Sequence, residues 1–423
     1  MIIPSIDIQD GQVVQLIGGR DKALAAGDPQ PWARRFGRTG LTAVVDLDAA
    51  IGRGDNADLI APLLRLAPCT VGGGIRDLHS ARGWLDRGAA RIVIGTAATP
   101  ELLRQLPSDR VIVALDTLND EVLSHGWRRG TGSSIQTRMQ ELAGLAGGFL
   151  VTDVAREGRL EGLDLAWARD LSAAAGEADL IVAGGVADVA EIAALDKLGI
   201  DAQVGMALYT GHFHEADALA ACLSSDRQDG LWPTIVAEDS GEVLGMAWSN
   251  RESLRRALDT GRGVYWSRRR GLWIKGETSG DGQILKRVDL DCDRDCLRFT
   301  VQQQGRGFCH QGTTTCFGSG RGIAGLIARL QARLAAAPTG SYTRRLLDEP
   351  ELLAAKLKEE AGELASAETE AEVIHETADL LYFALTAMVR SGVRLDQVTA
   401  ELDRRALTVS RRPGNAKQAG ESR

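Results

Sequence analysis

The chain has 423 residues, of which 44% are hydrophobic and 25% are charged, and its formal net charge at pH 7 is -8. This length exceeds one ordinary hydrophobic core, so the sequence predicts two or three domains. The acidic balance is spread along the chain, which argues against nucleic acid as a partner, and the absence of an apolar run of about 18 residues or of a signal-peptide pattern argues against a membrane.

Residues 1–223 alternate short, β-branched apolar runs with helical stretches. Near-continuous apolar runs separated by helices are typical of parallel strands that are buried on both faces. Eight such units in this length predict a (β/α)₈ TIM barrel. The expected strands are IIPSIDI, TAVVDLD, CTVGGG, ARIVIGT, RVIVALD, GFLVTDV, DLIVAGG and DAQVGMA.

The eight runs repeat as two sets of four, which predicts two similar half-sites at the barrel mouth. Asp7 ends the first run and Asp116 the fifth, while the second run carries Asp46 and the sixth carries Asp153. Because the carboxyl ends of barrel strands form the active face, Asp7 and Asp116 would approach a substrate from two sides as an acid/base pair. Glycine turns let backbone N–H groups close on phosphate, so we expect a long substrate with a phosphate at each end. The candidate phosphate-binding residues are Gly73, Gly74, Gly95, Thr96, Gly184, Gly185 and Gly205.

Two further domains follow the polar break at residues 224–230. Residues 229–320 are rich in strands and turns and predict a small α+β domain with an antiparallel sheet. Residues 338–410 show apolar residues at spacings of three and four, which predicts packed amphipathic helices. We expect the final residues, 411–423, to be disordered.

Four of the six cysteines, Cys292, Cys296, Cys309 and Cys316, fall inside residues 289–316. Asp291, Asp293 and Asp295 are interleaved with the first two of them. On a strand the three aspartates would share one face and Cys292 and Cys296 the other. The carboxylates suit Mg²⁺ and the thiolates suit Zn²⁺. Clustered thiolates also indicate a reducing cytoplasm.

The zinc site has two interpretations at this point. Three ligands, Cys292, Cys309 and Cys316, would leave one position for a catalytic water, whereas Cys296 as a fourth ligand would give a closed structural site. The neighbouring His310 favours chemistry, because it could carry protons.

An acidic pattern, EExxE followed by ExxD, marks the helical region. Residues three or four apart share a helix face, so two antiparallel helices would direct these carboxylates at one another, where Mg²⁺ and a phosphate substrate are expected. The alternative is a solvated acidic face. The candidate ligands are Glu359, Glu360, Glu363, Glu376 and Asp379.

The motifs DCDRD, CHQGTTTC, WSRRRGLWIKGETSG and GMAWSN resemble the phosphoribosyl-AMP cyclohydrolase family. The resemblance implies that Cys292, Cys309 and Cys316 bind zinc, and that a zinc-bound water opens a ribosylated adenine ring. It also implies that Asp291, Asp293 and Asp295 hold Mg²⁺. The zinc site of that family is shared between subunits, which implies a homodimer through this domain.

The stretch from SYTRRLLDEPELL to HETADLLYFAL is similar to phosphoribosyl-ATP pyrophosphohydrolases, which are all-α, MazG-like proteins. The resemblance implies that the acidic residues bind Mg²⁺ on a triphosphate and help water to cleave it between the α and β phosphates.

The barrel motifs, among them IIPSIDIQDGQVVQL, VGGGIRD, HGW and TDVAREGRLEG, resemble the ProFAR isomerase family. The resemblance implies an Amadori rearrangement with Asp7 as general base, Asp116 as general acid and Asp153 assisting. The related cyclase family shares the barrel and both aspartates, but HGW followed by RRGTG fits the isomerase better.

Together the three resemblances imply successive steps of histidine biosynthesis on phosphoribosyl nucleotides. Three alternatives stay open. The barrel could also accept phosphoribosylanthranilate, it could be an inactive scaffold, or the helical domain could be a general nucleotide pyrophosphatase.

Overall fold

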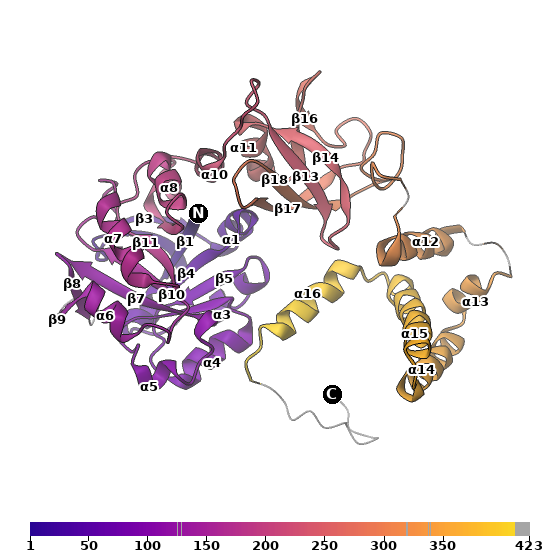
Figure 1. The fold of residues 1–423 in the computed structure, drawn as a ribbon, viewed down its shortest axis with the longest axis horizontal. Coiled ribbons are helices and arrows are strands. Elements are labelled where there is room, and N and C mark those ends of the chain that lie inside the picture. The colour runs from indigo at the N-terminus through magenta and orange to yellow at the C-terminus, as the bar shows by residue number, and fades with distance from the viewer. Residues whose placement is uncertain (125, 128, 319, 337, 339, 411–423) are drawn as a thin grey trace.

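The structure is a computed structural model, and it describes residues 1–124, 126, 127, 129–318, 320–336, 338 and 340–410. Figure 1 shows a barrel, a small sheet domain and a group of helices in chain order. The predicted disordered tail and His125 of the HGW motif lie outside the described residues.

Eight parallel strands close into a barrel, which confirms the predicted fold. Each strand pairs with the next along the chain, and the pairing of β12 with β1, in which Ile2 lies opposite Ala202, closes the ring. The barrel strands are β1 (Ile2–Gln9), β4 (Thr42–Asp46), β5 (Cys69–Gly72), β6 (Arg91–Ile94), β7 (Val111–Leu118), β10 (Gly148–Asp153), β11 (Asp179–Ala183) and β12 (Ile200–Val204).

The alternation of side chains along a strand decides what lies inside the barrel. Ile3 and Ile112 belong to a small apolar cluster that is separate from the larger core. Asp7 is four residues after Ile3, and Asp116 is four residues after Ile112, so both carboxylates lie on the same strand face as this interior cluster. Both aspartates are thereby placed at the mouth, above an apolar floor.

The strands that carry these two aspartates, β1 and β7, each continue into an antiparallel hairpin. The hairpins are β2 (Gln12–Ile17) with β3 (Asp21–Gly27), and β8 (Glu121–Ser124) with β9 (Arg129–Ser134). The barrel helices are α1 (Pro29–Phe36), α2 (Leu47–Ile51), α3 (Ala57–Ile60), α4 (Leu78–Arg87), α5 (Pro100–Leu103), α6 (Ile135–Glu141), α7 (Leu165–Ala175), α8 (Val189–Asp196), α9 (Met206–Tyr209) and α10 (Glu215–Cys222), with short 3₁₀ turns η1 (Gly37–Thr39), η2 (Leu63–Arg65) and η3 (Ser108–Arg110).

The middle domain contains a mixed sheet, so the predicted antiparallel sheet is wrong in one respect. Its strand order is β14-β13-β18-β17, and the central pair, β13 with β18, is parallel. The sequence indicates two hairpins but not which of their strands meet in the middle. The elements are β13 (Trp232–Glu238), β14 (Val243–Ser249), α11 (Arg251–Thr260), β15 (Val264–Ser267), β16 (Gly271–Ile274), β17 (Gln283–Leu290) and β18 (Leu297–Gln303).

The barrel and the middle domain are in direct contact. Their buried apolar residues form one continuous cluster. Arg38 donates to the carbonyl oxygen of Leu258 at 2.7 Å, and the ring of His214 lies 2.8 Å from the carboxylate of Asp259. These polar contacts fix the two domains against each other at the edge of the shared core.

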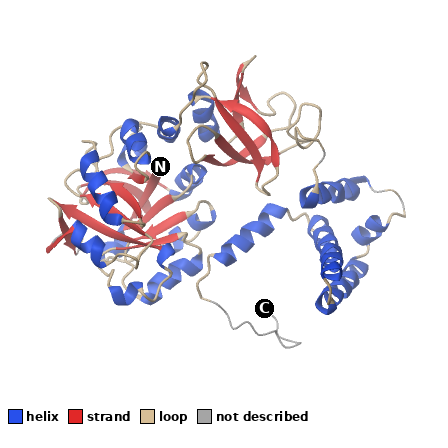
Figure 2. Cartoon of the chain, in the orientation of Figure 1, coloured by secondary structure: helices blue, strands red, loops and turns tan. Residues whose placement is uncertain are grey.

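The C-terminal region is helical, as Figure 2 shows. Its small apolar clusters, around Leu330 and around Leu346, are separate from the core of the other domains. After the last helix the chain returns to the barrel, where the amides of Val409 and Ser410 both donate to Asp86 at 2.8 Å. No helix of the described residues has the length and hydropathy to cross a membrane. The helices are α12 (Gly322–Ala336), α13 (Tyr342–Asp348), α14 (Pro350–Ser366), α15 (Glu370–Arg390) and α16 (Leu395–Ala406).

Candidate active sites

Asp7 lies at the mouth of the barrel, at the end of β1. Its carboxylate accepts hydrogen bonds from the hydroxyl of Ser5 at 2.6 Å and, more weakly, from the amide of Gln15 at 3.4 Å. The surrounding barrel removes water from the carboxylate and raises its pKa to about 6, although these two hydrogen bonds act in the opposite direction. A carboxylate with this pKa is suited to take up a proton near neutral pH.

Asp116 occupies the equivalent position at the end of β7. Burial raises its pKa, while hydrogen bonds with the side chains of Trp127 and Thr152 lower it in part. Trp127 comes from the β8–β9 hairpin and packs on Gly19 of the β2–β3 hairpin, where a Cβ atom would lie 2.3 Å from the indole ring. The indole therefore joins the two hairpins beside Asp116, and a side chain at position 19 would displace it.

Glu157 is a third acidic group at the mouth, and it was not among the predicted site residues. Burial, followed by the charges of Asp7, Asp116 and Asp153, raises the pKa of Glu157 to about 8. The carboxyl is therefore protonated at pH 7 and can donate a hydrogen bond. Its only signal in the sequence is its place four residues after Asp153, in the segment that follows the sixth strand.

Asp153 faces Arg156, with 3.1 Å between the carboxylate and guanidinium. It also accepts a hydrogen bond from the amide of Ala155 at 3.0 Å. These contacts occupy the carboxylate of Asp153, so it is a weaker candidate for proton transfer than Asp7.

The glycine turns of the two half-barrels share a structural requirement. Both Gly73 and Gly184 have positive φ, and a Cβ atom would lie 2.1 Å from the carbonyl oxygen of Asp46 in the first case and 2.5 Å from that of Asp153 in the second. Close approach of neighbouring strand ends therefore requires glycine here, with or without a phosphate. By contrast, Gly95 has open space around its Cα atom.

One hollow at the mouth brings part of the predicted site together. It is lined by Asp7, Gln15 and Glu157 and by the glycines of the second half-barrel. Gly73, Gly74, Gly95 and Thr96, which were predicted for the first half-site, are not among its lining residues. The predicted residues that line it are Asp7, Gly184, Gly185 and Gly205.

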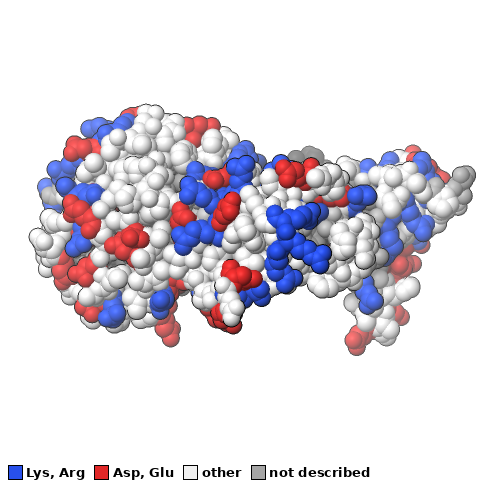
Figure 3. Space-filling view, turned by 90° about the horizontal axis from the view of Figure 1, so that it is seen from above, with Lys and Arg blue, Asp and Glu red and all other residues white. Residues whose placement is uncertain are grey.

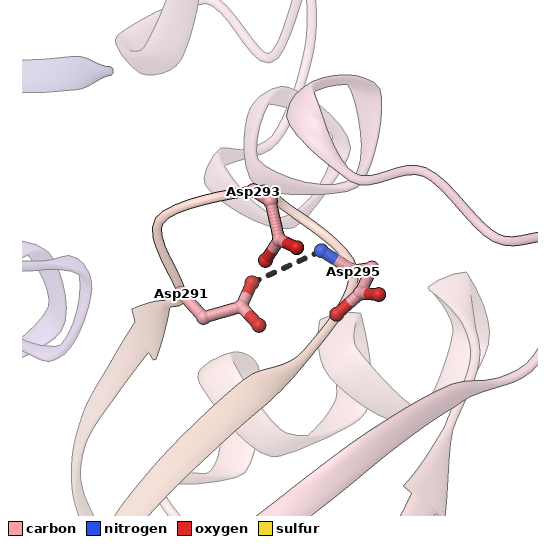
Figure 4. Close-up of side chains that lie close together, drawn as sticks. All are labelled: Asp291, Asp293 and Asp295. Carbon is pink, nitrogen blue, oxygen red and sulfur yellow. Dashed lines mark hydrogen bonds between the residues drawn. The ribbon is translucent and has the colours of Figure 1, made fainter.

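The three aspartates of the middle domain do not lie on a strand, so the predicted division into two strand faces is wrong. β17 ends at Leu290 and β18 begins at Leu297, and the six residues between them form the hairpin loop (called the metal loop below). Asp291 accepts hydrogen bonds from the amides of Asp295 and Cys296, both at 3.0 Å, and these bonds fold the loop. Loop folding, rather than strand pleating, gathers the carboxylates (Figure 4).

The metal loop fits a hard cation. One oxygen from each of Asp291, Asp293 and Asp295 lies within 4.8 Å of the others. The charge of Asp293 is the largest cause of a raised pKa at Asp295, so the carboxylates repel one another without a cation. Oxygen donors in this arrangement suit Mg²⁺.

Two of the three predicted zinc ligands lie together. Hydrogen bonds from the amide of Gln311, the hydroxyl of Thr313 and the thiol of Cys316 lower the pKa of Cys309, which favours its thiolate. The predicted proton carrier, His310, is exposed, with 4.0 Å between its ring and the sulfur of Cys309. The two sulfurs fit Zn²⁺, a soft-ligand metal.

Cys292 lies apart from this pair. Among the described residues, no group of three ligand atoms within 4.8 Å of one another includes a cysteine. Cys292 is exposed on the metal loop, and Cys296 is half-buried. One chain therefore presents two incomplete parts of the predicted zinc site.

The acidic residues of the helical region converge between α14 and α15. Glu359, Glu360 and Glu363 form one group within 4.8 Å, and Glu360 forms a second with Glu376 and Asp379. Glu360 is only 4% exposed, and its ion partner is Lys356 at 2.8 Å. Because Glu360 belongs to both groups, it is the central donor of a set that suits Mg²⁺.

Basic side chains gather on one face of the molecule between the barrel and the helices (Figure 3). In the middle domain the guanidinium groups of Arg227 and Arg268 lie 4.2 and 5.4 Å from the ring centre of Trp248. Arg268 and its two successors in the chain are exposed. Such stacked, exposed arginines are suited to phosphate.

In comparisons with known proteins, each region of the chain matches a family model. A model for the histidine biosynthesis protein family matches residues 1–214, one for phosphoribosyl-AMP cyclohydrolase matches residues 245–318, and one for phosphoribosyl-ATP pyrophosphohydrolase matches residues 323–406.

Two of the curated relatives are named as histidine biosynthesis proteins. A histidine biosynthesis trifunctional protein of Komagataella pastoris is 49% identical over 205 residues, which are 48% of this chain and 24% of the relative. A bifunctional histidine biosynthesis protein of Schizosaccharomyces pombe is 50% identical over 204 residues, 48% of this chain and 49% of the relative. The chain thus spans half or less of these two relatives.

An imidazole-4-carboxamide isomerase of Halobacterium salinarum is 41% identical over 233 residues, which are 52% of this chain and 96% of the relative. This match covers nearly all of that isomerase. By its barrel the chain belongs to the histidine biosynthesis protein family, and two regions that match the cyclohydrolase and pyrophosphohydrolase family models follow that barrel in the same polypeptide.

Proposed function

We propose that the chain is a multifunctional enzyme of histidine biosynthesis. The helical region hydrolyses phosphoribosyl-ATP to phosphoribosyl-AMP, the middle domain opens the purine ring of that product, and the barrel isomerises the resulting ProFAR. The observation that carries the proposal is that each of the three matched regions holds its own cluster of suitable side chains. These are the acidic groups at the barrel mouth, the carboxylates of the metal loop, and the carboxylates of α14 and α15.

In the barrel, Asp7 takes up a proton and Asp116 delivers one from the opposite side of the mouth. Glu157, protonated at pH 7, donates a hydrogen bond to the reacting substrate, and Asp153 holds the mouth together through Arg156. The backbone amides of Gly184, Gly185 and Gly205 bind one phosphate, and Gly73, Gly74, Gly95 and Thr96 bind the other.

In the middle domain, Cys309 and Cys316 hold zinc together with Cys292 of a second copy of the chain. Zinc bound there would supply an activated water for attack on the purine ring. His310 moves the proton, and the metal loop holds Mg²⁺. The separation of Cys292 from the other two cysteines supports a homodimer through this domain.

In the helical region, Glu359, Glu360, Glu363, Glu376 and Asp379 bind Mg²⁺ and so hold the triphosphate for attack by water. All six cysteines of the chain are free, which supports a reducing compartment such as the cytoplasm.

The test is to supply the purified full chain with phosphoribosyl-ATP, Mg²⁺ and Zn²⁺ and to identify the products by mass spectrometry. We expect the isomerised ribotide and pyrophosphate to accumulate as the end products, with no phosphoribosyl-AMP or ProFAR left. Accumulation of phosphoribosyl-AMP would contradict the cyclohydrolase assignment, and accumulation of ProFAR would contradict the isomerase. Turnover of dUTP or dCTP as fast as that of phosphoribosyl-ATP would contradict a dedicated pyrophosphohydrolase. Activity on phosphoribosylanthranilate would show a dual-substrate barrel.

A further inference from the structure

The metal loop of the middle domain is attached to the barrel by its own central residue, Arg294. The guanidinium group donates two hydrogen bonds to the carboxylate of Asp196 at the end of α8, at 2.8 and 2.9 Å. Its third nitrogen donates to the carbonyl oxygen of Asp291 at 2.6 Å. The carbonyl of Arg294 accepts from the amide of Ser224 at 2.7 Å. One residue thus joins the loop to itself, to the barrel and to the segment between the domains.

The attachment point is on the opposite end of the barrel from the isomerase mouth. Asp196 also lies 3.2 Å from the amino group of Met1, which precedes β1 and is held by Asp201 at 2.8 Å. Asp7 is at the other end of the same strand. A change at Asp196 therefore leaves the isomerase residues in place.

The ion pair has the geometry of a strong contact. The side chain of Asp196 is 7% exposed and that of Arg294 is 30% exposed, and the pairing is bidentate. Burial raises the pKa of Asp196, but the hydrogen bonds from Arg294 and the amino terminus outweigh this and lower it. Arg294 has a φ of 62°, a left-handed conformation that a non-glycine residue holds only when its surroundings determine it.

We propose that Arg294 is a positioning residue through which the barrel preorganises the Mg²⁺ site of the cyclohydrolase domain. The loop carries three mutually repelling carboxylates, and the contact with Asp196 holds its fold while they converge. The inference rests on the proposed cyclohydrolase function, because that function places Mg²⁺ at these aspartates.

For the variant Arg294→Gln, charge alone and loss of positioning predict opposite changes in the affinity of the metal loop for a cation. Removal of a positive charge beside three carboxylates strengthens cation binding by Coulomb attraction. Loss of positioning weakens it. Weaker binding after Arg294→Gln therefore identifies the positioning effect.

The experiment measures Mn²⁺ binding, by calorimetry and electron paramagnetic resonance, in the full chain. All proteins carry Glu360→Gln and Asp379→Asn to remove binding by the helical region. We expect Arg294→Gln and Asp196→Asn each to weaken Mn²⁺ binding about tenfold or more. The double variant should bind as each single variant does, because both changes break one contact. Isomerase activity should be unchanged.

Two controls match these variants. Asp201→Asn removes a charge beside Asp196 that does not contact the loop, and Arg298→Gln removes an arginine of the same hairpin that pairs with Asp289 instead. Both should bind Mn²⁺ with the same affinity as the parent, which is the chain that carries only Glu360→Gln and Asp379→Asn. If Arg294→Gln and Asp196→Asn bind Mn²⁺ as tightly as the parent, the inference is overturned but the proposed metal site is not. A parent chain that binds no Mn²⁺, or that binds it unaltered after Asp293→Asn, would overturn the proposed metal site together with the inference.

Discussion

The barrel mouth and the proposed zinc site differ in how many of their residues a single chain supplies. In the barrel, Asp7, Asp116 and Glu157 converge because closure of the sheet brings opposite strand ends together. In the middle domain, Cys309 and Cys316 meet within one segment, but Cys292 lies elsewhere on the same domain. A closed barrel completes its own site, whereas an open sheet with an exposed loop can leave ligands for a second copy.

The largest expected effect is in the barrel. Asp7→Asn should lower the isomerase kcat/KM about 10³-fold, since a general base contributes about 10² to 10⁴. The cyclohydrolase and pyrophosphohydrolase rates of the same protein are internal controls and should not change. Unaltered isomerase output would instead favour the scaffold interpretation of the barrel.

Complementation between variants of the middle domain should distinguish its site from that of the barrel. Cys316→Ala and Cys292→Ala should each lower cyclohydrolase activity at least about 10²-fold and reduce bound zinc. Refolding equal amounts of the two variants together should restore about a quarter of the wild-type activity, because half of the dimers then contain one intact site out of two.

Mixing Asp7→Asn with Asp116→Asn should restore no isomerase activity, since both groups belong to one chain. Restored isomerase activity, or a failure of the two cysteine variants to complement, would remove the difference between the two sites.

The helical region lies between these cases, because its carboxylates converge within one chain. Glu360→Gln should lower the pyrophosphohydrolase rate about 10²-fold, whereas Glu359→Gln should lower it less than about tenfold, since Glu360 belongs to both carboxylate groups. Measuring the pyrophosphohydrolase rate of each variant as a function of Mg²⁺ concentration tests this difference. Equal effects of the two substitutions would argue against a central role for Glu360.

The pH dependence of the isomerase rate should report on the acidic groups at the barrel mouth. The pKa of Asp7 is about 6, and the base acts when ionised, so the isomerase kcat/KM should fall about tenfold per pH unit below pH 6. Protonated Glu157, with a pKa of about 8, adds a decline above pH 8 that Glu157→Gln should remove. A profile that is flat between pH 5 and about 7 would contradict the role of Asp7.

The last expected effect concerns stability rather than rate. The pKa of Glu157 is raised from 4.5 to about 8, so the folded chain binds a proton that the unfolded chain releases, and the free energy of unfolding falls as pH rises through this window. At pH 9, Glu157→Gln should raise the free energy of unfolding of the barrel by up to about 5 kcal/mol, because each pKa unit between 4.5 and about 8 corresponds to about 1.4 kcal/mol. At pH 4 the two proteins should be equally stable, and an equal difference at both pH values would rule out titration as the cause.

Much of the barrel could be predicted because local pattern and fold agree there. Apolar runs of strand length followed by Asp or Gly define the strand ends, and a parallel barrel always brings those ends to one face. Glu157 escaped prediction because it lies in a loop, where no periodicity indicates the direction of a side chain. The three aspartates of the metal loop were predicted as ligands, but their loop conformation was not, for a related reason. Alternate aspartates in a turn converge through hydrogen bonds to Asp291 rather than through the pleat of a strand.

The sequence by itself determined the three regions, the eight strands and the residue types available for acid/base and metal chemistry, because periodicity and spacing are local properties. Only the tertiary structure decided which of these residues meet. It placed Glu157 among the barrel aspartates, separated Cys292 from Cys309 and Cys316, and set Arg294 against Asp196, since contacts between residues about a hundred positions apart depend on how whole elements pack.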